Sequence, residues 1–74
     1  MPDYIAKKNA IAANVEVLGD LLKSAYETVA HADAAIRLGD RNQAIGALVG
    51  LDSKLEDALA LYRASIAIHR SRRA

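Results

Sequence analysis

Three carboxylates lie close together in the second half of the chain, at Asp52, Glu56 and Asp57. Carboxylates placed near one another can act as general acid and base, or can bind a cation. These three fall within a helical repeat that also carries Lys54, and they do not follow the pattern of a calcium-binding loop. We therefore expect a solvated acidic helix face at this position.

The two histidines also lack the surroundings of a metal or catalytic site. His31 follows Glu27 by one helical turn, so the two side chains share a face. The Glu-x-x-His motif of di-iron bundles is absent, because Thr28 and Ile66 stand three residues before the histidines. The chain has no cysteine, no glycine-rich phosphate loop and no nucleophile elbow. We expect no catalytic residues, no metal and no cofactor.

Basic residues gather near both ends of the chain. They are Lys7, Lys8, Arg63, Arg70, Arg72 and Arg73. If the chain folds back on itself, these side chains meet at one end, where arginine forks could bind the phosphates of RNA or DNA. The net charge of only +1 and the lack of an aromatic residue in the tail argue against this interpretation.

The elements that position these residues are predicted by an apolar repeat with alternating steps of four and three. Such spacing places side chains in one stripe along a helix, as in the seam of a coiled coil. In the first half the stripe comprises Tyr4, Lys8, Ile11, Val15, Leu18, Leu22, Ala25, Val29, Ala32 and Ile36. In the second half it comprises Ala44, Leu48, Leu51, Leu55, Ala58, Tyr62, Ser65 and His69.

The repeat is interrupted at Leu38-Gly39-Asp40, where the residues favour a turn between two helices. Gly39 suits a left-handed residue after a helix, and Asp40 with Gln43 forms a capping-box pattern for the next one. A similar triplet at Gly19 lacks this capping pattern, and the repeat passes through it without a shift. A three-helix chain with a break at Gly19 is the alternative.

We thus predict an all-α fold in a single domain, residues 1–74. It comprises a helix over about 3–38, a turn at 39–40, an antiparallel helix over about 41–70 and a basic tail at 71–74. In this hairpin, residues whose numbers sum to about 79 lie at the same level. Tyr62 then lies near Leu18 and Gly19, and we expect Gly19 to leave space for the Tyr62 ring or for a partner's backbone.

The small size and composition of the chain favour association. Its 74 residues include only three aromatic side chains and no cysteine, so neither a large core nor disulfides can stabilise it. Apolar residues also flank both stripes, at Ile5, Leu21, Tyr26, Ile45, Leu59, Leu61, Ile66 and Ile68. We expect two hairpins to pair into a four-helix bundle. The predicted interface comprises Ile11, Val15, Leu18, Leu22, Val29, Leu48, Leu55, Leu59, Tyr62 and Ile66.

The expected function is a non-enzymatic interaction, scaffold or regulatory module that forms a homodimer and also contacts a protein partner through a helix face. The absence of a leader or membrane-spanning segment predicts a cytoplasmic protein without membrane contact. The alternative is a nucleic-acid-binding regulator using Lys7, Lys8, Arg70, Arg72 and Arg73. A third possibility is an enzyme or metal protein that uses Glu27, His31, Asp52 and Glu56. One more surface for a partner helix is a stripe of mostly small residues at Gly46, Gly50, Ser53, Asp57, Ala60, Ala64 and Ala67.

Overall fold

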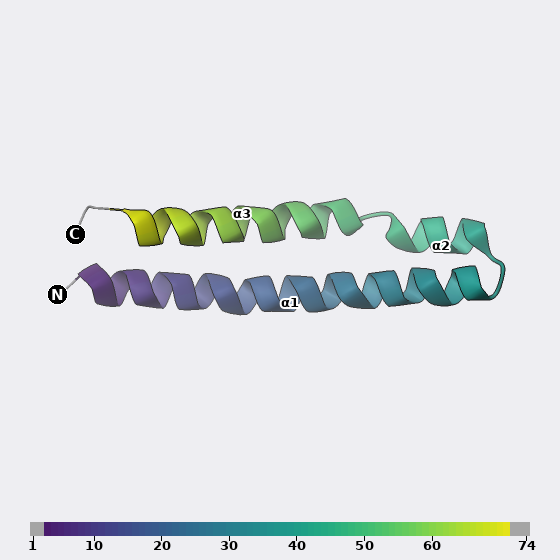
Figure 1. Cartoon of the computed structure of the whole chain (residues 1–74), viewed down its shortest axis with the longest axis horizontal. Coiled ribbons are helices and arrows are strands. Elements are labelled where there is room, and N and C mark those ends of the chain that lie inside the picture. The colour runs from purple at the N-terminus through teal and green to yellow at the C-terminus, as the bar shows by residue number, and fades with distance from the viewer. Residues whose placement is uncertain (1–2, 72–74) are drawn as a thin grey trace.

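The computed structural model of the chain describes residues 3–71 and consists of helices joined by short turns (Figure 1). Helix α1 spans Asp3–Arg37, α2 spans Arg41–Leu48 and α3 spans Leu51–Arg70. The arm formed by α2 and α3 runs back along α1, so both ends of the described chain lie at the same end of the molecule. The predicted all-α antiparallel hairpin is confirmed over these residues, with the second arm bent.

The turn at residues 38–40 has the predicted chemistry. Gly39 adopts a left-handed conformation with φ of 80°. The Gly39 amide donates to the Ile36 carbonyl at 2.9 Å, and the Asp40 amide donates to the Ala35 carbonyl at 2.9 Å, which together close a Schellman motif. The Asp40 side chain then accepts a hydrogen bond from the Gln43 amide at 2.9 Å and caps α2.

The three-helix alternative with a break at Gly19 is wrong, because α1 continues through this residue. The expected packing of the Tyr62 ring against Gly19 within the chain is also wrong. A Cβ atom added at Gly19 would have no heavy atom within 4 Å outside its own helical backbone and chain neighbours. The space at Gly19 therefore opens to the surface of the single chain.

The prediction of one continuous helix over about 41–70 is also wrong, since the arm is interrupted at Val49 and Gly50. Val49 has extended geometry, with φ of −63° and ψ of 128°. Gly50 is left-handed, with φ of 92°, a conformation that costs other L-residues energy. The apolar repeat does not reveal this interruption, because the seam spacing continues from Ala47 to Leu51 across it.

The two arms pack along a seam that agrees with the predicted stripe at every second position. At the positions between, the packed residue is the one before the predicted residue. Half of the predicted seam positions are retained, but their neighbours differ. On α1 the buried or half-buried seam residues are Lys7, Ile11, Asn14, Leu18, Leu21, Ala25, Thr28, Ala32 and Ala35. On the second arm they are Ala44, Ala47, Leu51, Lys54, Ala58, Leu61, Ser65 and Ile68. The predicted alternates Val15, Leu22, Val29, Ile36, Leu48, Leu55, Tyr62 and His69 are exposed instead.

Small and polar residues dominate this seam. Among the described residues, those that are buried are all alanine: Ala25, Ala32, Ala35, Ala44 and Ala58. Lys54 Nζ lies 3.1 Å from Thr28 Oγ1, which in turn lies 3.1 Å from the Ser24 carbonyl oxygen. The Ser65 hydroxyl is buried without a hydrogen-bond partner among residues 3–71. Alanine lets the helices approach closely but removes little apolar area from water.

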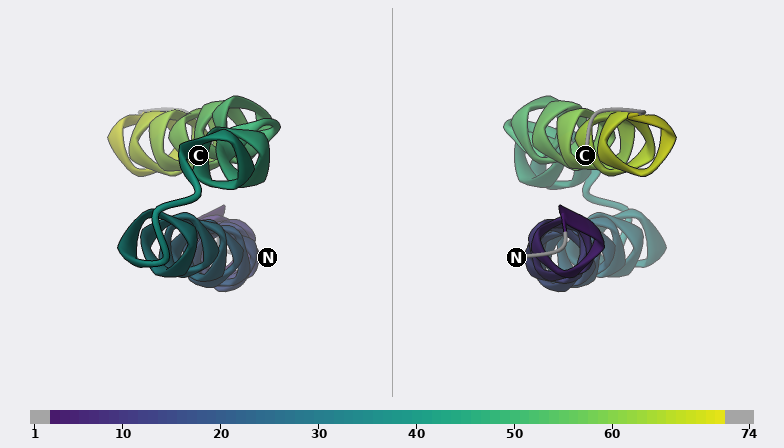
Figure 2. Two further views of the ribbon diagram at one scale, coloured as in Figure 1. Left: turned by 90° about the vertical axis from the view of Figure 1, so that its right-hand side faces the viewer. Right: turned by 90° about the vertical axis from the view of Figure 1, so that its left-hand side faces the viewer.

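The molecule is a thin rod of paired helices with Cα extents of 57 × 14 × 12 Å (Figure 2). Its accessible surface is 5867 Å². A compact monomer of 7.9 kDa is expected to expose about 4,400 Å². The single hairpin therefore leaves roughly 1,500 Å² more surface in water than a compact protein of its mass, by the same scaling.

The left-handed residue at the bend generates a prediction with a matched control. Neither Gly50 nor Gly46 has a heavy atom within 4 Å of an added Cβ, so space does not distinguish them. We expect Gly50→Ala to lower the free energy of unfolding by about 1–2 kcal/mol, because alanine is strained at this φ. Gly46→Ala, inside α2, should raise it by up to about 1 kcal/mol. Urea unfolding at equal chain concentration measures both, and equal effects would contradict the left-handed bend.

Candidate functional site: an exposed apolar face

The large apolar side chains of this protein lie mainly on its surface. Among the residues whose burial is described (5–71), thirteen large hydrophobic residues are exposed. Ten of them occupy the seam-adjacent stripe of each arm or the position just outside it. We call these ten the apolar face: Val15, Leu22, Tyr26, Val29 and Ile36 on α1, and Ile45, Leu48, Leu55, Leu59 and Tyr62 on α2 and α3. The other three are Val17, Leu38 and Val49.

The two stripes of the apolar face lie on the same side of the hairpin. The two helices of an antiparallel pair are related by a rotation of 180° about an axis perpendicular to the plane that contains them. This rotation exchanges the helices but leaves the two sides of the plane unchanged. Val15 lies one turn after the seam residue Ile11, and Leu55 lies one turn after the seam residue Leu51. Residues at such equivalent positions of the two arms therefore flank the same side of the pair.

The opposite side confirms this assignment of sides. Val17 and Leu21 of α1 line a shallow groove together with Asp57, Ala60 and Leu61 of α3. Val17 and Asp57 lie directly before the seam residues Leu18 and Ala58, so they flank the other side of the pair. The predicted small-residue stripe lies on this second side and is exposed along its length, with Gly50 falling in the bend. Most of the large exposed apolar residues thus lie on one side of the hairpin, and the stripe of mostly small residues lies on the other.

The structure distributes the ten predicted interface residues between the seam and the apolar face. Ile11, Leu18 and Ile66 are half-buried within the chain. The remaining seven are exposed and belong to the apolar face: Val15, Leu22, Val29, Leu48, Leu55, Leu59 and Tyr62. Tyr26, Ile36 and Ile45 complete that face but were not among the predicted interface residues. Their signal was present in the sequence, because Ile36 belongs to the predicted stripe and Tyr26 and Ile45 are apolar positions beside it.

The exposed side chains of the apolar face are larger than those that the hairpin buries against itself. Val15 is 55% exposed, Leu22 49% and Tyr62 54%. In the seam between the two arms the buried residues are alanines, and large side chains such as Leu18, Leu21 and Leu61 are half-buried. Since hydrophobic stabilisation scales with the apolar area removed from water, the half-exposed side chains of the apolar face leave part of that stabilisation unused in a single chain.

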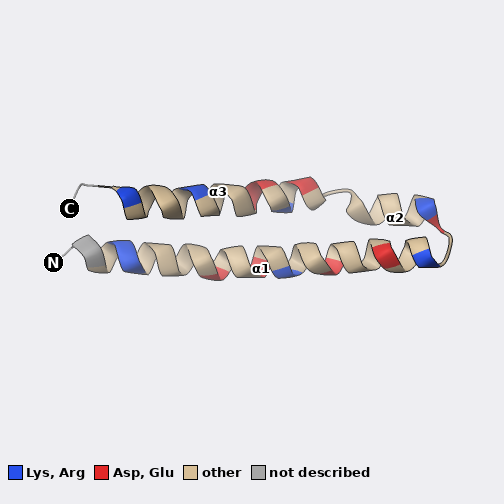
Figure 3. Cartoon of the chain, viewed as in Figure 1, with Lys and Arg blue, Asp and Glu red and all other residues tan. Residues whose placement is uncertain are grey.

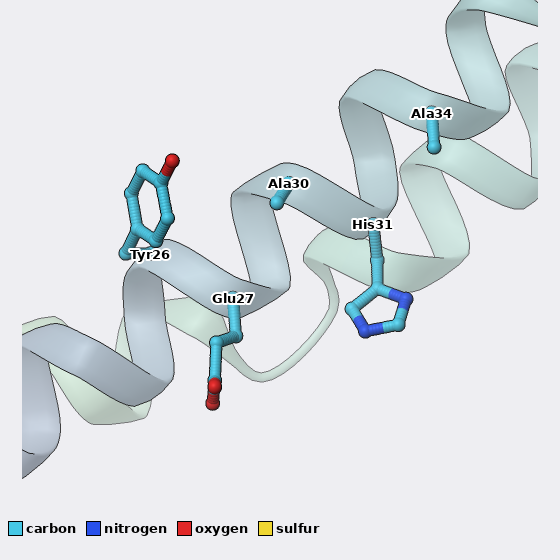
Figure 4. Close-up of a pocket in the computed structure, with 5 residues that line it drawn as sticks. All are labelled: Tyr26, Glu27, Ala30, His31 and Ala34. Atoms are coloured by element: carbon cyan, nitrogen blue, oxygen red, sulfur yellow. The ribbon is translucent and has the colours of Figure 1, made fainter.

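The titratable residues singled out from the sequence do not form a reactive cluster. Glu27 and His31 extend from α1 in roughly the same direction, away from Tyr26, but form no hydrogen bond or ion pair in the described structure (Figure 4). The Asp52 carboxylate accepts a hydrogen bond from the Ser53 amide at 2.9 Å at the start of α3, and Glu56 is exposed. Within residues 3–71 no three His, Cys, Asp or Glu side chains come together to hold a metal ion.

One ion pair stabilises the helix end beside the turn. Arg37 Nε donates to Asp33 Oδ2 at 2.9 Å. This hydrogen bond, and then the charge of the carboxylate, raise the pKa of Arg37. Both side chains are largely exposed, so the pair contributes little to stability.

The fold brings Lys7, Lys8 and Arg70 to the open end of the rod, while Arg37 and Arg41 lie beside the turn at the other end (Figure 3). Lys7 and Lys8 lie in the first turns of α1, across from Arg70 at the end of α3, and Arg63 lies about two turns before that end. Lys7 Nζ donates a hydrogen bond to the Ser71 carbonyl oxygen and links the two arms at this open end. The predicted contacts Arg72 and Arg73 lie outside the described residues.

Comparison with protein-family models, curated proteins and solved structures yields no match for this chain. No helix within residues 3–71 is long and apolar enough to cross a membrane.

Proposed function

We propose that the protein is a non-enzymatic interaction module that works by self-association through its apolar face. The observation that carries this proposal is the placement of ten of the thirteen exposed large hydrophobic residues on one side of the hairpin. Soluble monomers seldom expose a continuous apolar surface of this kind, and such surfaces are typical of protein–protein contacts. A scaffold or regulatory role follows from an assembly that presents polar helix faces outward.

The thin core supports the same proposal. Ordering each residue costs about 1–2 kcal/mol of backbone entropy, which burial must offset. The described chain buries only alanine fully, and it contains no cysteine that could crosslink it. Pairing two hairpins through their apolar faces would cover Leu22, Val29 and Leu55 and form a four-helix bundle. Folding and association would then be coupled.

Two valines of α1 provide a matched test of this function. Val15 on the apolar face is 55% exposed, and Val17 on the opposite side is 48% exposed. We expect Val15→Lys to raise the dimer dissociation constant about a hundredfold, because each dimer carries the change twice and each buried lysine costs on the order of 1–2 kcal/mol. Val17→Lys should leave the dissociation constant within a factor of about 3 of the original, as surface substitutions usually do.

Sedimentation velocity over a dilution series measures both dissociation constants. Circular dichroism at high concentration checks that each variant still folds. Equal dissociation constants for the two lysine variants would contradict a role for the apolar face, and so would a folded parent chain that never associates.

An alternative function is nucleic-acid binding at the open end, and the observation that favours it is the convergence of Lys7, Lys8, Arg63 and Arg70 there. If this is the function, the logarithm of affinity should fall linearly with the logarithm of salt concentration.

Replacing Lys8 and Arg70 with alanine tests this alternative by fluorescence anisotropy. The double variant should bind a labelled RNA or DNA more weakly and lower the salt slope by about 1 per lost phosphate contact. Arg41→Ala, at the opposite end of the rod, is the control and should change neither quantity. Salt-insensitive binding, or an equal effect of Arg41→Ala, would remove this function.

A further inference from the structure

The surface that the single rod leaves in water indicates what covers the apolar face. The rod exposes 5867 Å², roughly 1,500 Å² above the surface of a compact monomer of its mass. A standard interface buries about 800 Å² per partner, and obligate homodimers bury more. A second copy of the same chain would supply a face of equal length and matching apolar character, so the excess surface fits a two-fold homodimer.

The two stripes of the apolar face share one centre. On the second arm Leu48, Leu55 and Tyr62 follow one another at steps of seven, so Leu55 is central. On α1 the stripe from Val15 to Ile36 is centred near residue 25. Residues 55 and 25 lie at about the same level, because buried Ala35 packs with Ala44 and half-buried Ala47 packs with the same cluster. A two-fold axis at this level keeps both stripes in register with their copies.

Charge decides between the two ways of stacking a pair of rods face to face. With the open ends at the same pole, Lys7, Lys8 and Arg70 would stack on their copies across layers about 8–10 Å apart. This separation is close to the Debye length of about 8 Å at physiological salt, so the repulsion is only partly screened. With the open ends at opposite poles, each basic end comes near the partner's turn, where Asp33 and Asp40 balance Arg37 and Arg41, so the stacking of like charges is avoided.

We infer that two copies associate through their apolar faces with opposite poles, each open basic end reaching past the turn of the other copy. In this arrangement α1 packs on the second α1 and α3 on the second α3, with all neighbouring helices antiparallel. Because the apolar face is centred closer to the turn, each basic end projects by about ten residues, or roughly 15 Å. This inference rests on the proposed self-association and adds its geometry: a bundle with one basic pole at each end.

Cysteine crosslinking tests the geometry directly, since the native chain has no cysteine. With a two-fold axis at the level of Leu55, a Leu55→Cys thiol faces its own copy. A Tyr62→Cys thiol instead faces position 48, so it should crosslink only when mixed with Leu48→Cys. In the same-pole arrangement, Leu55 lies beside Leu22 of the other copy. An equal mixture of Leu22→Cys and Leu55→Cys would then crosslink.

We expect Leu55→Cys to form a disulfide-linked dimer in a glutathione buffer about a hundredfold faster than Val17→Cys. The reason is that facing thiols in a dimer have a millimolar effective concentration, whereas outward thiols meet at the micromolar concentration of the chain. Non-reducing electrophoresis measures both rates, and the Tyr62→Cys and Leu48→Cys mixture should crosslink equally fast.

The outcomes separate this inference from the function on which it rests. A stable dimer in which Leu55→Cys reacts no faster than Val17→Cys overturns the opposite-pole arrangement but leaves self-association in place. Faster crosslinking in the Leu22→Cys and Leu55→Cys mixture than in Leu55→Cys alone assigns the same-pole arrangement and also overturns it. A parent chain that remains monomeric at every concentration overturns both.

Discussion

The structure depends on how one hairpin divides its apolar residues between two stripes. Each arm has a seam of mostly small or polar residues that packs against the other arm, and a second stripe of Val, Leu, Ile and Tyr beside it. A helix that faces only one partner can bury only one of these stripes. The intrachain contact uses the seam that contains Ala25, Ala32, Ala44 and Ala58, so the larger side chains remain on the surface. The hydrophobic effect acts on area, and the half-exposed side chains of the apolar face leave apolar area in water.

Much of the fold follows from the sequence because local chemistry and periodicity agree there. Gly39 and Asp40 provide a left-handed helix end and a cap in succession, and the structure contains both. Periodicity also carried α1 correctly through Gly19. The bend at Gly50 was missed because Val49 and Gly50 replace one helical turn without shifting the stripe. A backbone change that preserves the phase leaves no trace in a pattern of apolar spacing.

The choice of seam was predicted less well, for a physical reason. Leu21 and Leu22 are both apolar, as are Leu61 and Tyr62, so two stripes one residue apart satisfy the same repeat. The structure places Leu21 and Leu61 in the seam and leaves Leu22 and Tyr62 exposed. Packing distance separates these possibilities, since alanine and threonine at neighbouring seam positions let the arms approach closely. Spacing alone carries no information about that distance.

The central claim is that the apolar face is covered by a second copy, so that folding and association are coupled. Sedimentation equilibrium of the unmodified chain at micromolar concentration tests it most directly, combined with thermal unfolding over a hundredfold concentration range. We expect a mass twice 7.9 kDa and an unfolding midpoint that rises with concentration, by mass action. A folded species of 7.9 kDa whose unfolding midpoint does not change with concentration would contradict it.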